Sequence, residues 1–151
     1  MKEVRILIGI PASGKSTFAK NFVFSHKGYK IVSTDDIRWK LFGDASIQGN
    51  PKMIFAIAYK EIMSYLDKGY NVIFDATNIS RKNRVNLINF LKECEVENVV
   101  ADYFPVTIDI ALERNQQRKR HVPEKVIYKM FGKIEKPIYE EGFSVINCHS
   151  D

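Results

Sequence analysis

The sequence has 151 residues, a length that fits one domain, and 45% of them are hydrophobic, which is enough for a buried core and excludes a disordered chain. No apolar run approaches the ~20 residues that span a bilayer, so we expect no membrane-spanning helix. The net charge of +5 suits a protein that binds phosphates or a polyanion, although many proteins without such ligands share it.

Strands and helices are predicted to alternate from the start of the chain. Residues 4–10 form an apolar, Ile-rich run that stops at glycine and proline, which is typical of a buried strand that ends in a turn. The elements that follow in the first half are a helix at 15–26, a strand at 29–33, a helix at 35–42 closed by Gly43, and a helix at 51–68 with Gly69 as its C-cap.

The alternation continues in the second half. The predicted elements are a strand at 71–74, a helix to about Glu93 with Ser80 as its N-cap, a strand at 96–104, a helix at 107–118, a helix opened by Pro123, and a short strand at 144–147. Such alternation implies a parallel sheet covered on both faces, because parallel strands need crossover helices. In such sheets ligands bind beyond the carboxyl ends of the strands. We predict one α/β domain over residues 1–151.

Residues 9–17 match the phosphate-binding pattern G-x-x-x-x-G-K-[ST] at every fixed position, with a strand before and a helix after. A chance match is expected in roughly one chain of this length in a hundred or fewer. Lys15 is expected to bridge the β- and γ-phosphates of ATP or another nucleoside triphosphate, and the Ser16 hydroxyl to ligate Mg²⁺. The residues predicted to bind the donor here are Gly9, Ala12, Ser13, Gly14, Lys15, Ser16 and Thr17, of which Thr17 could simply continue the helix.

A carboxylate that could accept a proton follows the second strand. A kinase benefits from such a group as the γ-phosphoryl arrives at the acceptor hydroxyl. Asp35 and Arg38 are three apart, so on a helix they share a face and could hold a hydroxyl and a neighbouring phosphate, whereas Asp36 points away. Alternatively, Thr34 or Asp35 only caps the helix and Arg38 is a surface residue.

Other positions have both a structural and a functional interpretation. Trp39 and Phe42 could stack on a base, but aromatic residues at helical spacing favour the core. Asp75 ends the third strand, where an acid can bind the metal through water. Thr77 and Asn78 could contact the acceptor or could simply favour a turn.

The segment 113–123 is rich in cations and is a candidate lid. Arg114 and Arg118 are four apart on one face of a helix end, where an arginine could stabilise charge on the transferring phosphoryl group. For Lys119 and Arg120 the helix dipole alone is a sufficient explanation. The helix that follows the third strand begins with three cations that could contact the acceptor backbone but are more simply explained as a solvated face: Arg81, Lys82 and Arg84.

Taken in order, these residues resemble the kinase domain of bacteriophage-type polynucleotide kinase. The phosphate loop alone indicates only a superfamily, whereas the Asp35/Arg38 pair combined with Arg118 is more specific. The matching motifs are residues 9–17, Asp35-Asp36-x-Arg38, Asp75-x-Thr77-Asn78, and Arg114-Asn115 with Arg118 before Pro123.

The resemblance implies a three-layer P-loop kinase fold, a five-stranded parallel sheet with the third strand beside the first, helices on both faces and a basic lid. It also implies that Asp35 is the general base, that Arg38 binds the acceptor's 3′-phosphate and that Arg118 binds the donor phosphates. The phage enzyme continues into a phosphatase domain, but this sequence has no D-x-D-G-T motif. The expected activity is therefore addition of a 5′-phosphate to RNA or DNA, without the phosphatase step.

Three functions remain open. The first is a polynucleotide 5′-hydroxyl kinase, and the second is a kinase of a metabolite, nucleotide sugar or antibiotic, which the closing segment 140–146 also fits. The third, a non-catalytic nucleotide-dependent switch, needs no hydroxyl-activating acid, so Asp35 and Arg38 argue against it. Cys94 and Cys148 match no metal or redox spacing, so we expect reduced thiols, no disulfide and a cytoplasmic protein.

Overall fold

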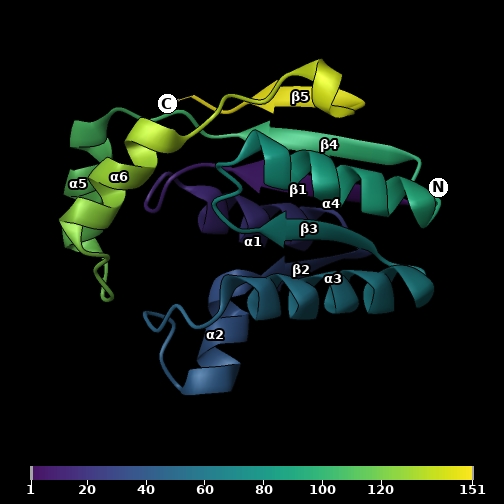
Figure 1. The fold of residues 1–151 in the computed structure, drawn as a ribbon, viewed down its shortest axis with the longest axis horizontal. Helices are drawn as coiled ribbons and strands as arrows, with labels where there is room; N and C mark the ends of the chain where they lie inside the picture. Colours follow the sequence, from purple (N-terminus) through teal and green to yellow (C-terminus); the bar gives the residue numbers. More distant parts are fainter. Residues whose placement is uncertain (1, 151) are drawn as a thin grey trace.

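Figure 1 shows the fold in a computed structural model, which describes residues 2–150. The strands are β1 (Glu3–Ile8), β2 (Tyr29–Ser33), β3 (Asn71–Asp75), β4 (Asn98–Tyr103) and β5 (Val145–Cys148). The helices are α1 (Lys15–Ser25), α2 (Thr34–Phe42), α3 (Pro51–Asp67), α4 (Arg81–Glu93), α5 (Ile108–Gln117), α6 (Glu124–Lys133) and the 3-10 turn η1 (Tyr139–Glu141). Apart from η1, every element was predicted from the sequence, with bounds that differ by a few residues at most.

The five strands form one parallel sheet in the order β2-β3-β1-β4-β5. β3 lies beside β1, as the resemblance implied, with Ile6 paired to Phe74 on one side and to Ala101 on the other. All the strands therefore end at the same edge, the one toward which the arrows point in Figure 1. The phosphate loop, the start of α2 and the helices α5 and α6 gather at that edge.

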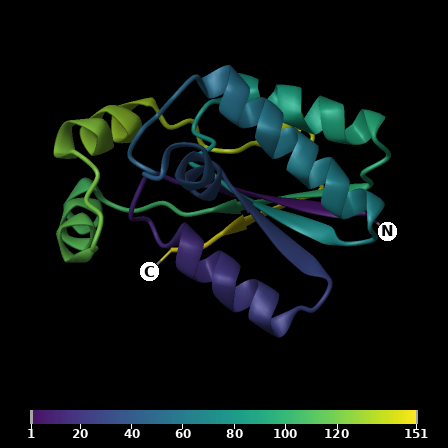
Figure 2. The same cartoon turned by 90° about the horizontal axis from the view of Figure 1, so that it is seen from below.

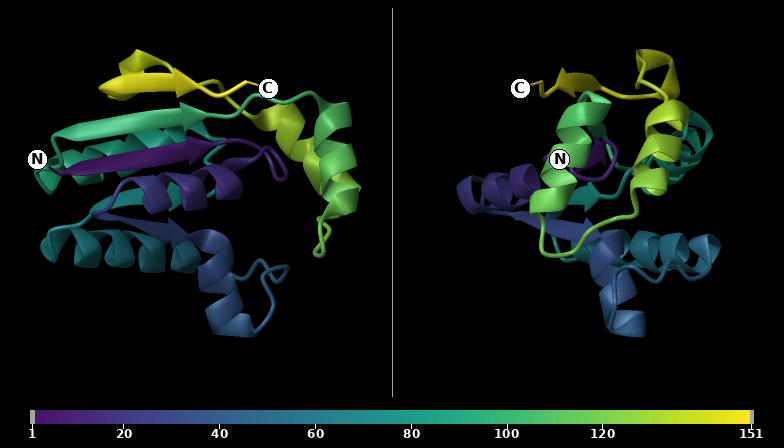
Figure 3. Two further views of the ribbon diagram at one scale, coloured as in Figure 1. Left: turned by 180° about the vertical axis from the view of Figure 1, so that it is seen from behind. Right: turned by 90° about the vertical axis from the view of Figure 1, so that its left-hand side faces the viewer.

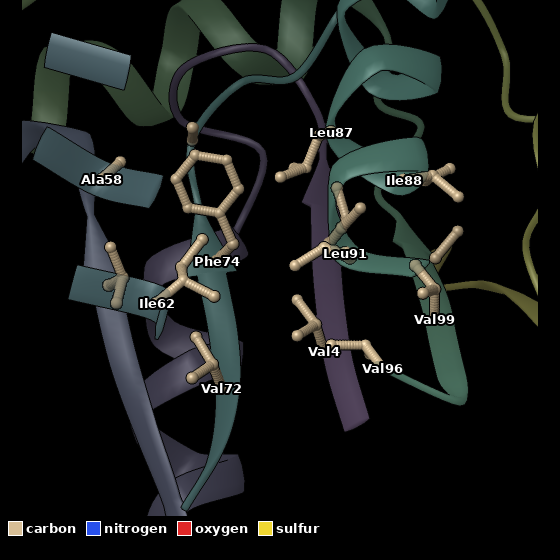
Figure 4. Packing of buried hydrophobic residues seen from close by; sticks show 14 of the residues in the cluster. Val4, Ala58, Ile62, Val72, Phe74, Leu87, Ile88, Leu91, Val96 and Val99 are labelled. Carbon is tan, nitrogen blue, oxygen red and sulfur yellow. The ribbon is translucent and has the colours of Figure 1, made fainter. Parts of the chain in front are cut away.

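Helices cover both faces of the sheet, so the predicted three layers are confirmed (Figure 2). Alternate residues of a strand point to opposite faces, and in β1 Ile6 packs toward α3 and α4 whereas Leu7 packs toward α1. Figure 4 shows the larger core on the α3–α4 side. Full burial of an Ile or Leu side chain contributes about 1.5–3 kcal/mol, so these two cores hold the strand ends in place.

Side chains that cap helices set where the functional segments begin. The Ser33 hydroxyl accepts a hydrogen bond from the Asp36 N–H at 3.2 Å, so Ser33 is the N-cap of α2. The alternative in which Thr34 or Asp35 caps this helix is therefore wrong, and the Asp35 carboxylate is not used as a cap. Ser80 caps α4 as predicted, since its hydroxyl accepts from the Asn83 N–H.

Two expectations about side-chain environment need correction. Trp39 is not in the core: its side chain is 61% exposed on α2, because the helix extends beyond the edge of the sheet and nothing among the described residues covers that side. Phe42 does pack against the core. Among residues 2–150 no helix has both the length and the apolar character needed to cross a membrane.

Candidate phosphotransfer site

A cavity of about 360 Å³ lies at the carboxyl ends of the strands. Its walls come from the phosphate loop, the start of α2, the end of β3 and the lid. The lid is the name we use for α5, α6 and the loop between them. Twelve of the residues that the sequence nominated line it, namely Ala12, Ser13, Gly14, Lys15, Ser16, Thr17, Asp35, Arg38, Asp75, Thr77, Arg114 and Arg118. Gly9 and Asn78 are not among its lining residues.

The phosphate loop has the backbone shape that an anion site requires. Ala12 and Gly14 have positive φ angles of 65° and 100°, which turn successive peptide groups toward one side. α1 begins directly after Gly14 without a side-chain cap or an acidic residue in its first turn. Its first N–H groups and the positive end of its dipole are therefore available to an anion in the cavity.

Gly9 acts through packing, outside the cavity wall. A Cβ atom added at Gly9 would lie 2.5 Å from the Ser13 hydroxyl and 3.2 Å from the Phe104 Cβ, so a side chain there would displace the loop. The Gly9 N–H also donates to the Thr77 carbonyl at 3.0 Å and fixes the loop against the segment that follows β3.

Lys15 is almost completely buried and turns back into the loop. Its ammonium donates to the Ile10 carbonyl at 2.9 Å and to the Ser13 hydroxyl at 3.4 Å. Burial lowers the pKa of Lys15 to about 8, with the nearby Asp75 and Asp35 opposing this shift and Arg118 adding to it. A desolvated ammonium at the floor of the cavity would interact strongly with an incoming phosphate.

Ser16 and Asp75 place two oxygen groups of the kind that bind Mg²⁺ next to each other. The Ser16 hydroxyl donates to the Asp75 carboxylate at 2.8 Å, and Asp75 is buried at the end of β3. Burial raises the pKa of Asp75, while Lys15 and the Ser16 hydrogen bond oppose that rise. No cluster of three or more His, Cys, Asp or Glu side chains within residues 2–150 could cage a metal. The hydroxyl–carboxylate pair nevertheless fits Mg²⁺, which typically binds one or two protein oxygens together with water and substrate phosphates.

Asp35 lines the cavity at the start of α2 and accepts hydrogen bonds from two guanidinium groups. Arg38 donates to its Oδ1 at 3.1 Å, which places the two side chains on one helix face as the spacing predicts. Arg120 of the lid donates to its Oδ2 at 3.0 Å. Arg38 also donates to the Gln48 carbonyl at 3.4 Å, so it is not an unattached surface residue. Asp36 is exposed and does not line the cavity.

Thr77 and Asn78, the two residues predicted after β3 to contact the acceptor, have different environments in the structure. Thr77 lines the cavity. Asn78 is buried with a left-handed φ of 48°, and its amide donates to the Leu7 carbonyl at 2.7 Å and the Ala76 carbonyl at 3.3 Å. The prediction that Asn78 contacts the acceptor is therefore not supported, because its amide group is committed to the backbone at the ends of two strands.

Two arginines of the lid line the cavity, but their backbone conformation differs from the one that the sequence indicated. α5 ends at Gln117, and Arg118 has an extended backbone, so Arg114 and Arg118 do not share a helix face as predicted. Both still line the cavity, and a Cβ added at Gly14 would lie 3.9 Å from the Arg114 Nη1. Figure 3 shows the loop between α5 and α6 at the same edge of the sheet as α2, and Arg120 of this loop contacts Asp35 at the start of α2.

Sequence reasoning missed three contributions to this site. Arg120 was attributed to the helix dipole, but α5 ends before it and it contacts Asp35. Asn115 is buried and exchanges two hydrogen bonds with the Val122 backbone, at 2.8 and 2.9 Å, which fixes the shape of the lid loop. The Arg114-Asn115 pair in the resemblance was the available signal for Asn115.

Arg84 is the third contribution that sequence reasoning missed. The prediction that it lies on a solvated face was wrong. Its side chain is 0% exposed and makes a bidentate pair with Glu141 at 2.7 and 2.9 Å. It also donates to the Asn78 carbonyl at 2.8 Å. Arg84 therefore connects η1 to the segment after β3 that contains Thr77, a residue of the cavity wall. Arg81 is only partly exposed and bonds to the same Glu141.

Comparison with known proteins gives relatives that are kinases by name. The chain is 33% identical over 141 residues to the L-seryl-tRNA(Sec) kinase of Methanococcus maripaludis, a match that covers 87% of this chain and 52% of that protein. It is 28% identical to a putative bifunctional polynucleotide kinase/RNA ligase of Autographa californica nuclear polyhedrosis virus, over 89% of this chain and 21% of the viral protein. The chain thus spans about half or less of the length of these relatives.

Comparison with solved structures also gives a similar protein. The chain superposes on a component of the Pnkp1/Rnl/Hen1 RNA repair complex with a TM-score of 0.76 and 25% identity, over 87% of this chain and 43% of that one. Residues 4–137 match the model of the AAA domain family AAA_33, whose P-loop implies binding of a nucleoside triphosphate. Family and relatives together support a phosphotransferase with a hydroxyl acceptor. The chain belongs to the AAA_33 family and has the P-loop kinase fold.

Proposed function

We propose that the chain transfers the γ-phosphate of ATP or another nucleoside triphosphate to the 5′-hydroxyl of a polynucleotide. The observation that carries the proposal is the position of Asp35, which lines the same cavity as Lys15 and Ser16 and lies beside Arg38. A nucleotide-dependent switch has no need of a carboxylate at this place. The relatives that bear the name polynucleotide kinase support the choice of acceptor.

The donor half of the mechanism belongs to the phosphate loop. The loop N–H groups and Lys15 would bind the donor phosphates, and Arg118 would add positive charge from the lid side. Ser16 would hold Mg²⁺, with Asp75 acting through a water molecule. Bound Mg²⁺ supplies charge neutralisation for the β- and γ-phosphate oxygens.

The acceptor half belongs to α2. The acceptor hydroxyl would donate to the Asp35 carboxylate, which takes its proton as the hydroxyl oxygen bonds to the γ-phosphorus and the bond to the β-bridging oxygen breaks. Arg38 would bind the phosphate on the 3′ side of the attacked nucleoside through a charge-assisted contact. Thr77, on the cavity wall between the two halves, would contact the acceptor as well.

A second acceptor is favoured by a specific observation. The relative with 33% identity is an L-seryl-tRNA(Sec) kinase, whose name places the hydroxyl on an amino acid attached to RNA. The chemistry of Asp35 would be the same for that hydroxyl, but Arg38 would then meet a different anionic group. The two acceptors therefore differ in what lies next to the hydroxyl.

Transfer of a labelled γ-phosphate tests these proposals directly. The acceptors are RNA and DNA oligonucleotides with a 5′-hydroxyl, the same oligonucleotides with a 5′-phosphate as matched controls, seryl-tRNA, and a panel of small alcohols. We expect label on the 5′-hydroxyl oligonucleotides alone. Label on seryl-tRNA alone would select the second acceptor, and label only on a small alcohol would contradict both.

A further inference from the structure

Both oxygens of the Asp35 carboxylate are already in use. Oδ1 accepts from Arg38 at 3.1 Å and Oδ2 from Arg120 at 3.0 Å. A hydroxyl that is to be deprotonated must come within about 2.6–3.2 Å of the base. The guanidinium of Arg120 therefore occupies one of the positions from which an acceptor hydroxyl could donate to Asp35.

The two arginines differ in how easily they could leave. Arg38 is on the same helix as Asp35, its side chain is only 15% exposed, and it is also bonded to the Gln48 carbonyl. Arg120 comes from the lid, 85 residues away in sequence, and is 36% exposed. Of the two contacts, the one made by Arg120 is the one that movement of the lid loop would break.

Arg120 rests on an acidic part of the acceptor side. Besides its contact with Asp35, its charge helps to lower the pKa of the exposed Asp44, after the larger effect of the Ser46 hydrogen bonds. Arg118, two residues earlier, lines the cavity, and its charge lowers the pKa of Lys15 in the phosphate loop. The lid thus places one arginine toward the donor and one toward the acceptor base.

We propose that Arg120 determines specificity between the acceptor and water, by holding Asp35 until an anionic acceptor draws the guanidinium away. The proposal rests on the role of Asp35 as the base in the proposed function. A phosphate on the acceptor is a strong alternative partner for a guanidinium, because it can accept two parallel charge-assisted hydrogen bonds. Water carries no such group, so it leaves Arg120 on Asp35.

The side reaction that Arg120 would suppress is hydrolysis of the donor. In it a water oxygen bonds to the γ-phosphorus, the bond from that phosphorus to the β-bridging oxygen breaks, and the water proton goes to Asp35. The products are a nucleoside diphosphate and inorganic phosphate. While Arg120 donates to Oδ2, the lone pair that accepts this hydrogen bond is not available to a water molecule. A guanidinium has donors and no acceptor, so Arg120 does not take the water proton in place of Asp35.

Release of inorganic phosphate from ATP with Mg²⁺ and no acceptor tests this proposal. We expect Arg120→Ala to raise the hydrolysis rate about ten- to a hundredfold, the change that loss of one charge-assisted hydrogen bond produces. Arg120→Lys keeps a cation that can reach Asp35 and should restore much of the suppression. The matched control is Lys119→Ala, which removes a charge from an exposed neighbour in the same loop and should leave hydrolysis unchanged.

The double variant Asp35→Asn/Arg120→Ala shows whether the effect acts through Asp35, and it should lose the gain in hydrolysis. The proposal is overturned if Arg120→Ala binds ATP normally without faster hydrolysis, if Lys119→Ala gives an equal rise, or if the rise persists in the double variant. These outcomes need no acceptor. They are therefore distinct from a failure of the proposed function, which would appear as wild-type protein that phosphorylates no hydroxyl at all.

Discussion

At the scale of single residues, the site contrasts two charged groups, Lys15 and Asp35, that line one cavity. Lys15 is buried in the phosphate loop, and its charge is costly before a phosphate arrives. Asp35 is half exposed and is held by cations from two different elements. Each group has an arrangement that an incoming substrate would change, so each can be tested separately.

Asp35→Asn keeps the shape of the side chain but does not accept the hydroxyl proton. Turnover should fall by about 10²–10⁴-fold, the usual contribution of acid–base catalysis, while nucleotide affinity stays the same. Steady-state transfer and a nucleotide titration measure the two quantities. Asp36→Asn is the matched control, because Asp36 is exposed and outside the cavity. An equal loss of turnover in that variant would assign the base to Asp36.

Arg38→Ala tests the acceptor contact in a two-by-two comparison. Wild type and variant are assayed on a nucleoside 3′-phosphate and on the plain nucleoside. We expect a loss of about ten- to a hundredfold on the phosphate-bearing acceptor and little loss on the other, since a charge-assisted contact contributes about 1.5–3 kcal/mol. Equal losses on both acceptors would mean that Arg38 serves the donor or the fold.

The low pKa of Lys15 predicts a pH dependence of donor binding. In the free protein this pKa is about 8 because of burial, and the phosphates of a bound donor should raise it. The complex then holds more protons than the free protein, so affinity should fall as the pH rises through about 8. Calorimetry in two buffers of different ionisation enthalpy should detect proton uptake near this pH. Lys15→Met should show no uptake, and uptake in that variant would assign the effect to another group.

At the scale of elements, the Arg84–Glu141 pair joins α4 to η1 and supports the turn after β3. Arg84→Met should destabilise the protein by about 3–5 kcal/mol, because it leaves a buried carboxylate without its main partner. Urea unfolding measures the change. Lys82→Met, an exposed position on the same helix, should stay within about 0.5 kcal/mol. The double variant Arg84→Met/Glu141→Met should recover part of the loss, and no recovery would argue against a pairwise effect.

The elements show which part of the structure local sequence predicts. The ends of the helices are set by residues that act on their own neighbours, such as Ser80 at the start of α4 and Gly43 at the end of α2, so both were found from sequence alone. Arg84 was misread because its partner lies 57 residues away and no local pattern distinguishes a buried arginine from a solvated one. Arg118 was misread because the last turn of α5 ends one residue earlier than its pattern suggests.

At the scale of the whole molecule, alternation of strands and helices predicted a parallel sheet with ligands at its carboxyl edge. The strand order came from the resemblance, because alternation alone does not say which strands are neighbours. The phosphate loop is one short motif, and all but one of the loop residues that line the cavity were nominated from the sequence. The contact of Arg120 with Asp35 joins the lid to α2 and could not be predicted in this way, because only the folded chain brings the two residues together.

Trp39 has a practical consequence, because it is the only tryptophan in the sequence. It is largely exposed on α2, one helical turn beyond Asp35, and it lies outside the phosphate loop. Its intrinsic fluorescence therefore reports on α2, the proposed acceptor side, without any label. Quenching by a 5′-hydroxyl oligonucleotide, together with little response to ATP, would allow the two substrates to be followed independently in one cuvette.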